Sequence, residues 1–277
     1  MRRSSSFLSE TTNTHLRRLQ LNIAYGKNLR ASQLTKQFPD LLTKKEGVCD
    51  YSQRKFMPLY PLQLAAYYQN TKLCEVLRSY LPDKIAREQL ESLELDGAHY
   101  TTPDKPGMFI LEPHYSPDEL LYKLSKVIEC ADQSPEKKYR ALLAFGKEQQ
   151  MMPPQMVMWY CSKRKNLHCF DLFSNRQKKH TLSTAEEPSM GNLYVMHATT
   201  KEKYFWYQQV STQANYLGKT TAAFGLTDPL LVRAYEDISP EKAASDLHAL
   251  KKFFAETSFG YKHFLCVVQS SFRYKKY

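Results

Sequence analysis

Short apolar stretches at helical spacing alternate with polar interruptions through the first hundred residues. In the segment 60–70 (YPLQLAAYYQN), Pro61 stands where a first helical turn tolerates a missing N–H. The next stretch repeats apolar residues at i, i+3, i+4 and i+7: Leu73, Val76, Leu77 and Tyr80. The pattern predicts two short helices joined by a tight turn.

An earlier pair of segments is similar to this one. Residues 21–26 (LNIAYG) lead into 34–42 (LTKQFPDLL), and the intervening residues 44–57 are interpreted as an inserted loop. A third helix is expected over 83–95, ended by Gly97. Because about three repeats are needed to bury a stacked core, residues 15–100 are predicted to form ankyrin-like helical hairpins.

The rest of the chain predicts a second region. Residues 101–117 contain several prolines and Gly107, which favours a connector. Ser116 and Pro117 then begin a new helix, and another begins near 237–241. Short strands are expected near 193–196 and 204–207. The predicted organisation is therefore mainly α: a flexible tail over 1–14, the repeat region over 15–100, the connector over 101–117, and a helical C-terminal domain over 118–277 with a small β element.

Composition is that of a folded protein, with 42% hydrophobic residues and 13% aromatic ones. The six cysteines are scattered, which fits reduced thiols in a cytosol better than a disulfide framework. No run of 18 apolar residues and no Sec-type signal is found, so a soluble protein without a transmembrane segment is expected. The net charge of +11 favours acidic partners.

Two patches carry a resemblance to a known group. The run 45–54 (KEGVCDYSQR) precedes the hairpin at 62–81, and the run 146–153 (GKEQQMMP) precedes 159–161 (WYC). These segments resemble ankyrin-like effector proteins of Legionella-type intracellular bacteria, over roughly residues 19–175. The resemblance implies a virulence effector that is cytoplasmic before export, leaves by type IV secretion, and acts on a host protein in the host cytosol. It implies no catalytic residues.

Candidate chemistry is sparse. Cys161, His168, Cys169 and His180 are the densest group of metal-ligand types, but they lack the Cys-x2-Cys pair typical of zinc sites, so no metal and no cofactor are expected. Cys49 beside Asp50, and Cys266 near His263, are the least implausible thiol nucleophiles. Residues 217–221 (LGKTT) keep only the second half of a phosphate-binding loop. Catalytic residues stay unknown, and the balance is against an enzyme.

A basic patch is the candidate contact for nucleic acid or an anionic membrane. It lies within 162–180, interleaved with two phenylalanines, and a solvated surface is the simpler interpretation of it. Its members are Lys163, Arg164, Lys165, Arg176, Lys178 and Lys179.

The leading hypothesis is a protein-interaction scaffold whose hairpins present a concave surface to a host protein. The residues expected on or near that surface are Tyr60, Gln63, Tyr67, Tyr68 and Gln69. One alternative is a transferase or hydrolase in residues 100–277, with a pocket lined by several of Cys161, His168, His197 and Asp228. The other is a basic adaptor that binds nucleic acid or anionic membrane.

Overall fold

The structure is a computed structural model. It describes residues 4–130 except position 104, scattered positions between 132 and 156, the short segments 194–196 and 203–205, and residues 240–270. The chain divides into two compact units. The first comprises residues 1–115, 153–155 and 258–277, and the second comprises 116–152 and 156–257.

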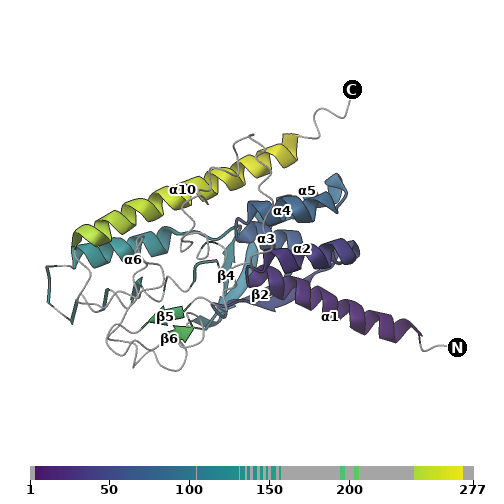
Figure 1. The fold of residues 1–277 in the computed structure, drawn as a ribbon, viewed down its shortest axis with the longest axis horizontal. Helices are drawn as coiled ribbons and strands as arrows, with labels where there is room; N and C mark the ends of the chain where they lie inside the picture. The colour runs from purple at the N-terminus through teal and green to yellow at the C-terminus, as the bar shows by residue number, and fades with distance from the viewer. Residues whose placement is uncertain are drawn as a thin grey trace. The chain divides into compact units, whose positions relative to one another are not determined.

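The first unit combines helices with an antiparallel sheet (Figure 1). Its elements, in chain order, are α1 (Ser4–Ala24), α2 (Asn28–Gln37), the 3-10 helix η1 (Pro39–Thr43), β1 (Glu46–Cys49), β2 (Lys55–Leu59), α3 (Pro61–Tyr67), α4 (Thr71–Ser79), α5 (Asp83–Asp96), β3 (Ala98–Thr102), β4 (Lys105–Glu112) and the last part of α10 (Pro240–Ser270).

The sheet has the strand order β1-β2-β3-β4, and each neighbouring pair is antiparallel. Phe56 pairs with Tyr100 across the middle of the sheet, and Tyr100 pairs with Ile110 of β4. Phe56 and Tyr100 are buried, whereas the residues that follow or precede them along the strands point to the opposite face. One face of the sheet therefore packs into the core of the unit.

The prediction of ankyrin-like helical hairpins is wrong. A four-stranded sheet stands where residues 44–57 were expected as a loop and residues 101–117 as a connector. The surroundings of α3 show why the unit is not a stack of hairpins. In such a stack one side of this helix would be exposed to solvent. All of α3 is buried here, because it contacts α1, α4, α5 and β3. It is the central helix of a mixed helix and sheet core.

Gly97 makes the sharp step from α5 into β3. It ends α5 with φ of 70° and ψ of 169°, a region of the backbone map that is essentially reserved for glycine. A Cβ at this position would lie 3.1 Å from Leu111 Cγ and 3.2 Å from the backbone of Glu112. The prediction that Gly97 ends the helix is confirmed, and the close approach of β4 is an additional reason for a glycine there.

Several helix predictions are confirmed. Helices α3, α4 and α5 lie at the expected positions, and α6 (Asp118–Glu129) begins behind Ser116, whose hydroxyl accepts the N–H of Asp118. The N-terminal tail expected over 1–14 is instead helical from Ser4 onward, as part of α1. Leu16, Leu19 and Ile23 recur along α1 at helical spacing and are buried.

The second unit contains α6, the two-stranded β5 (Tyr194–Met196) and β6 (Lys203–Phe205), and the first part of α10. The two short strands expected from the sequence are therefore present, and the helix expected near 237–241 begins at Pro240. Within the part of the chain that the structure describes, no helix is long and apolar enough to cross a membrane.

Candidate protein-interaction surface

The turn between β1 and β2 is built around one carboxylate. Asp50 Oδ1 accepts hydrogen bonds from the Ser52 hydroxyl at 2.7 Å and from the Arg54 N–H at 3.0 Å. The Asp50 N–H donates to the Arg54 carbonyl at 3.1 Å, and Gln53 takes a positive φ of 62° to close the turn. This local bonding is typical of aspartate, whose short side chain can satisfy nearby backbone N–H groups.

The Arg54 side chain turns from this hairpin into the core. Its Nε donates to Asp50 Oδ2 at 2.8 Å, and both side chains of this ion pair are 1% exposed. Five aromatic rings surround the guanidinium, each with its centroid 5.7–5.9 Å from Cζ, and they belong to Phe56, Tyr67, Tyr68, Tyr100 and Tyr115. At this range each ring face attracts the cation.

Burial alone would lower the pKa of Arg54. The adjacent Asp50 carboxylate and the surrounding tyrosines more than offset that effect, so the pKa is raised and the guanidinium stays charged. Its Nη1 donates a hydrogen bond to the Tyr67 hydroxyl at 3.4 Å. Its Nη2 has no hydrogen-bond acceptor among the described residues, so the ring faces are what stabilises Nη2.

Glu112 of β4 extends the same network across the sheet. Its Oε2 accepts hydrogen bonds from the Tyr100 hydroxyl at 2.9 Å and from the Tyr67 hydroxyl at 3.3 Å. Burial raises the pKa of Tyr67 well above its usual range and that of Tyr100 to about 12. Neutral, hydrogen-bonded hydroxyls of this kind hold structure together and are poor proton donors in catalysis. We therefore assign the Arg54 cluster, meaning Arg54, Asp50 and the rings around them, to the scaffold.

The residues expected to bind a partner mostly belong to this core. Tyr67, Tyr68, Gln63 and Gln69 are buried, and only Tyr60 is half-buried. The expectation that they form an open concave surface is corrected for these four. The sheet covers the side of α3 that a stacked repeat would leave exposed.

The two glutamines have structural partners instead. The Gln63 side chain donates to the Gln89 carbonyl of α5 at 2.8 Å, and the Gln89 side chain donates to the Leu42 carbonyl at 3.0 Å. The Gln69 side chain donates to the Tyr115 carbonyl at 3.0 Å. Sequence reasoning could not find these bonds, because each joins residues at least 26 positions apart.

Three of the exposed large apolar residues lie close together on the edge strand β4. Met108, Phe109 and Leu111 are 60%, 57% and 58% exposed, and we call these three residues the β4 patch. The pairing of β3 with β4 shifts between Tyr100 and Thr102, so that the strand bulges where Met108 and Phe109 stand. β4 begins with a lysine and a proline, as edge strands that face solvent often do, but its next apolar residues include three that are exposed. An exposed apolar cluster of this kind on an edge strand indicates a contact surface.

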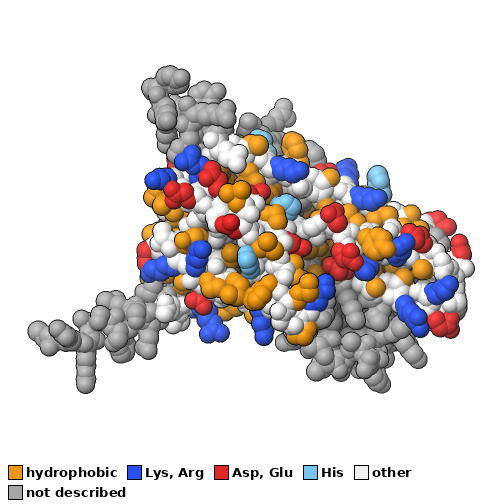
Figure 2. All heavy atoms as spheres, turned by 180° about the vertical axis from the view of Figure 1, so that it is seen from behind, with side chains coloured by type: hydrophobic (Ala, Val, Ile, Leu, Met, Phe, Trp, Pro, Cys, Tyr) orange, Lys and Arg blue, Asp and Glu red, His pale blue; other side chains and the backbone are white. Residues whose placement is uncertain are grey.

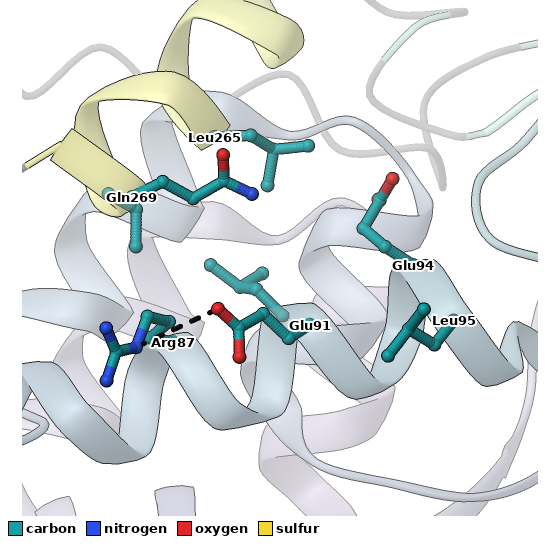
Figure 3. Close-up of a pocket in the computed structure, with 8 residues that line it drawn as sticks. Arg87, Glu91, Glu94, Leu95, Leu265 and Gln269 are labelled. Atoms are coloured by element: carbon teal, nitrogen blue, oxygen red, sulfur yellow. Dashed lines mark ion pairs between the residues drawn. The ribbon is translucent and has the colours of Figure 1, made fainter.

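A narrow groove separates α5 from the end of α10, and its side chains are drawn in Figure 3. Its volume is about 230 Å³, and its apolar lining residues are Leu90, Leu95, Leu265 and Val268. Glu91, Glu94, Arg87 and Gln269 complete the lining. Glu94 accepts a hydrogen bond from the buried Tyr261 hydroxyl at 3.0 Å, which ties α10 to α5.

Charged side chains are mixed on the face shown in Figure 2. Basic, acidic and apolar side chains alternate there over the described part of the molecule. The predicted basic patch (Lys163, Arg164, Lys165, Arg176, Lys178 and Lys179) lies outside the described residues, so it stays a prediction. The same holds for Cys161, His168, Cys169 and His180, for the segment 217–221, and for His197 and Asp228 of the enzyme hypothesis.

Two candidate chemistries fall partly within the described residues. Among these residues, no three His, Cys, Asp or Glu side chains gather to hold a metal ion. Cys49 is exposed, but partial burial and then the charge of Asp50 raise the pKa of its thiol. Since the thiolate is the nucleophile, a raised pKa disfavours Cys49 as a catalytic residue. Cys266 is exposed on α10.

Comparisons with known proteins give no relative. No protein-family model, no curated protein and no solved structure matches this chain.

Proposed function

We propose that this protein is a protein-interaction module that binds a partner protein through the β4 patch. The observation that carries the proposal is the exposure of three large apolar side chains within four residues of one edge strand, at 57–60% each. Burial of apolar area is the main favourable term in protein association, and clustered large side chains contribute most of it.

The scaffold behind the patch supports this function. Ile110 and Glu112 stand between or beside the patch residues, and Glu112 is held by the Tyr67 and Tyr100 hydroxyls of the Arg54 cluster. Leu111 lies against Gly97 at the start of β3. A contact strand anchored in this way loses little conformational freedom on binding, which favours affinity.

The three side chains of the β4 patch would form the centre of a wider contact. Specific interfaces bury roughly 800 Å² on each partner, and a few large apolar side chains at their centre contribute most of the affinity. The polar residues around the patch would then form the rim of the interface.

The biological setting that we propose follows the resemblance described above. On that basis the partner is a host protein, and the chain is an effector that is cytoplasmic in the bacterium and acts in the host cytosol after type IV secretion.

The test is affinity capture from eukaryotic cell lysate with the intact chain as bait, followed by mass spectrometry. Wild type is compared with Phe109→Lys and Leu111→Lys, and with the control Leu29→Lys, which alters a residue of α2 that is also 57% exposed. We expect a small set of proteins that is retained at high salt, retained by the control, and lost with either patch variant. Apolar contacts tolerate salt, whereas contacts between exposed charges are screened.

Two results would contradict the proposal. One is capture that is indifferent to both patch variants. The other is retention of only nucleic acid or lipid that salt removes, which would favour the basic adaptor instead. Melting temperatures of all variants serve as folding controls, because exposed substitutions change stability little.

A further inference from the structure

We propose that the groove between α5 and α10 is a second docking site, which takes a basic amphipathic helix of a partner protein. An apolar side chain of that helix enters the groove, and its lysine or arginine residues face the acidic rim formed by Glu91 and Glu94. The lining of this groove is separate from the β4 patch, so the two sites are independent proposals.

The size and lining of the groove select the kind of ligand. A volume of about 230 Å³ is below the roughly 300 Å³ at which pockets for drug-sized molecules begin. Leu90 and Val268 are buried, at 3% and 1% exposure, and form an apolar floor. Leu95 is 85% exposed beside them. A space of this kind fits one or two apolar side chains of a protein better than a cofactor.

The acidic rim is unusual for its position on α5. Glu91, Glu94 and Asp96 occupy the C-terminal part of the helix, whose last turn contains no basic residue. The helix dipole places partial negative charge at this end, so carboxylates there are unfavourable and cations are preferred. Each of these acids has a partner in the fold, since Glu91 pairs with Arg87, Glu94 accepts from the Tyr261 hydroxyl and Asp96 accepts from the Ser92 hydroxyl. Three carboxylates at this end of the helix still leave an excess of negative charge that a cationic partner would offset.

The charge of the rim also favours one class of macromolecular ligand over the others. The chain as a whole carries a net charge of +11, yet among the described residues the groove is lined by two carboxylates, Glu91 and Glu94, and by one cation, Arg87. Nucleic acid and anionic membranes are repelled by such a rim, and a basic protein segment is attracted. The partner class that fits is a protein with lysines or arginines beside apolar residues.

The rim can exchange its present contacts for those of a ligand. Figure 3 shows Glu91 paired with Arg87, and the Nε to Oε1 distance is 3.8 Å, with the two side chains 33% and 50% exposed. Exposed ion pairs at this distance contribute little, so Glu91 loses little when it turns to a ligand cation. Glu94 is fixed by Tyr261 and marks the other end of the rim.

The form of the ligand follows from the two helices that make the groove. Glu94 meets Tyr261, whereas Leu90 lines the groove with Leu265 and Val268. Side chains of neighbouring helices form ridges and grooves that a third helix fills with residues at i, i+3 and i+4. An amphipathic helix therefore supplies both the apolar insertion and the flanking cations.

The experiment measures binding of designed peptides to the intact chain by fluorescence anisotropy. The probe is a peptide of about 18 residues with leucines at helical spacing and lysines elsewhere, and its matched control has glutamates in place of the lysines. We expect the Leu/Lys peptide to bind at least ~10-fold tighter than the Leu/Glu peptide, and its affinity to fall as salt is added.

Variants of exposed residues locate the site without disturbing the core. Glu91→Lys and Leu95→Ala should each weaken the Leu/Lys peptide by about 10-fold. The control Glu88→Lys changes an exposed acid of the same helix that does not line the groove, and should change affinity by less than about 2-fold. Phe109→Lys in the β4 patch should leave peptide binding unchanged, which separates this proposal from the function proposed above.

Three outcomes would overturn the proposal. The first is absence of binding up to about 1 mM peptide. The second is equal affinity for the Leu/Lys and Leu/Glu peptides. The third is an equal effect of Glu91→Lys and Glu88→Lys, which would mean that net charge alone governs binding.

Discussion

The two faces of the four-stranded sheet differ in burial, because one packs into the core and the other is exposed to solvent. On the inner face, Phe56 and Tyr100 are buried around the guanidinium of Arg54, whose Nε donates to Asp50. On the other face and along the edge, Lys55 and His99 are exposed, as are the three residues of the β4 patch. Because side chains alternate along a strand, a single residue step separates the scaffold from the surface.

The difference shows where function can lie. A buried ion pair is out of reach of a partner protein, and removal of one of its groups leaves the other charge unpaired in the core and damages folding. Exposed apolar side chains contribute little to folding and gain by being covered. Substitutions on the two faces should therefore divide into effects on stability and effects on binding.

The largest expected effect is on the buried ion pair. Arg54→Met leaves the Asp50 carboxylate without its cation in the core, and should lower the free energy of unfolding by about 3–5 kcal/mol. Urea denaturation measures it. The matched control is Glu88→Gln, which removes the exposed i,i+4 pair with Lys84 and should cost less than about 0.5 kcal/mol. Similar losses for both variants would contradict the assignment of Arg54 to the core.

Truncation of a core ring should have an effect of nearly the same size. Tyr68→Ala removes a fully buried ring and its hydrogen bond to Asp50, and should cost about 3–5 kcal/mol. Tyr122→Ala, at a side chain that is 52% exposed on α6, should stay within about 0.5 kcal/mol. A small effect at Tyr68, with partner capture lost, would instead restore the original expectation that this residue binds a partner.

Substitution of Gly97 and of Gly107, both in the β3–β4 region, distinguishes the cost of backbone strain from the cost of steric contact. Gly97→Ala puts a Cβ against Leu111 and Glu112 and keeps an unfavourable backbone, which should cost about 1–3 kcal/mol. Gly107 also has a positive φ, of 78°, but a Cβ there meets no atom of the described residues within 4 Å. Thermal unfolding should thus show the larger loss at Gly97. Equal losses would mean that backbone strain alone explains both.

Alkaline pH should weaken the inner face. The pKa of Tyr100 is raised by burial from 10.0 to about 12, and that of Tyr67 is also raised. Below pH 10 the hydroxyls of Tyr67 and Tyr100 keep their protons in both the folded and the unfolded chain. As pH rises further, the unfolded chain loses them first and the unfolding free energy falls, until the folded hydroxyls ionise as well. Urea denaturation from about pH 8 to about pH 11.5 measures this fall. The double variant Tyr67→Phe/Tyr100→Phe should flatten it, and an unchanged slope would count against buried, neutral hydroxyls.

The smallest expected effect on stability belongs to the outer surface. Phe109→Lys and Leu111→Lys should change the free energy of unfolding by no more than about 0.5 kcal/mol, because both side chains are already more than half exposed. Chemical denaturation of the variants used for affinity capture provides the measurement. A loss as large as that of Tyr68→Ala would place β4 in the core and remove it as a candidate interaction surface.

Most of the helices could be located from the amino-acid sequence, because helix signals are local. Pro61 is the first residue of α3, Ser116 stands just before α6, and Gly97 ends α5. Apolar residues repeat every three or four positions along these helices. From the sequence, Tyr67 and Tyr68 were expected to lie on a partner-binding surface. The sequence could not say which side of the helix would be covered, and the partner-binding role assigned to these residues depended on that.

The sheet and the candidate site depend on contacts between residues that are far apart in the chain. The strands β1, β2 and β3 are four or five residues long, and Pro58, Pro106 and Gly107 stand within β2 and β4, where they favour loops when considered alone. Phe56 finds its partner Tyr100 more than forty residues away, so no local pattern predicts the pairing. That pairing buries Arg54, exposes the β4 patch, and turns residues 101–112 from an expected connector into the edge of the sheet.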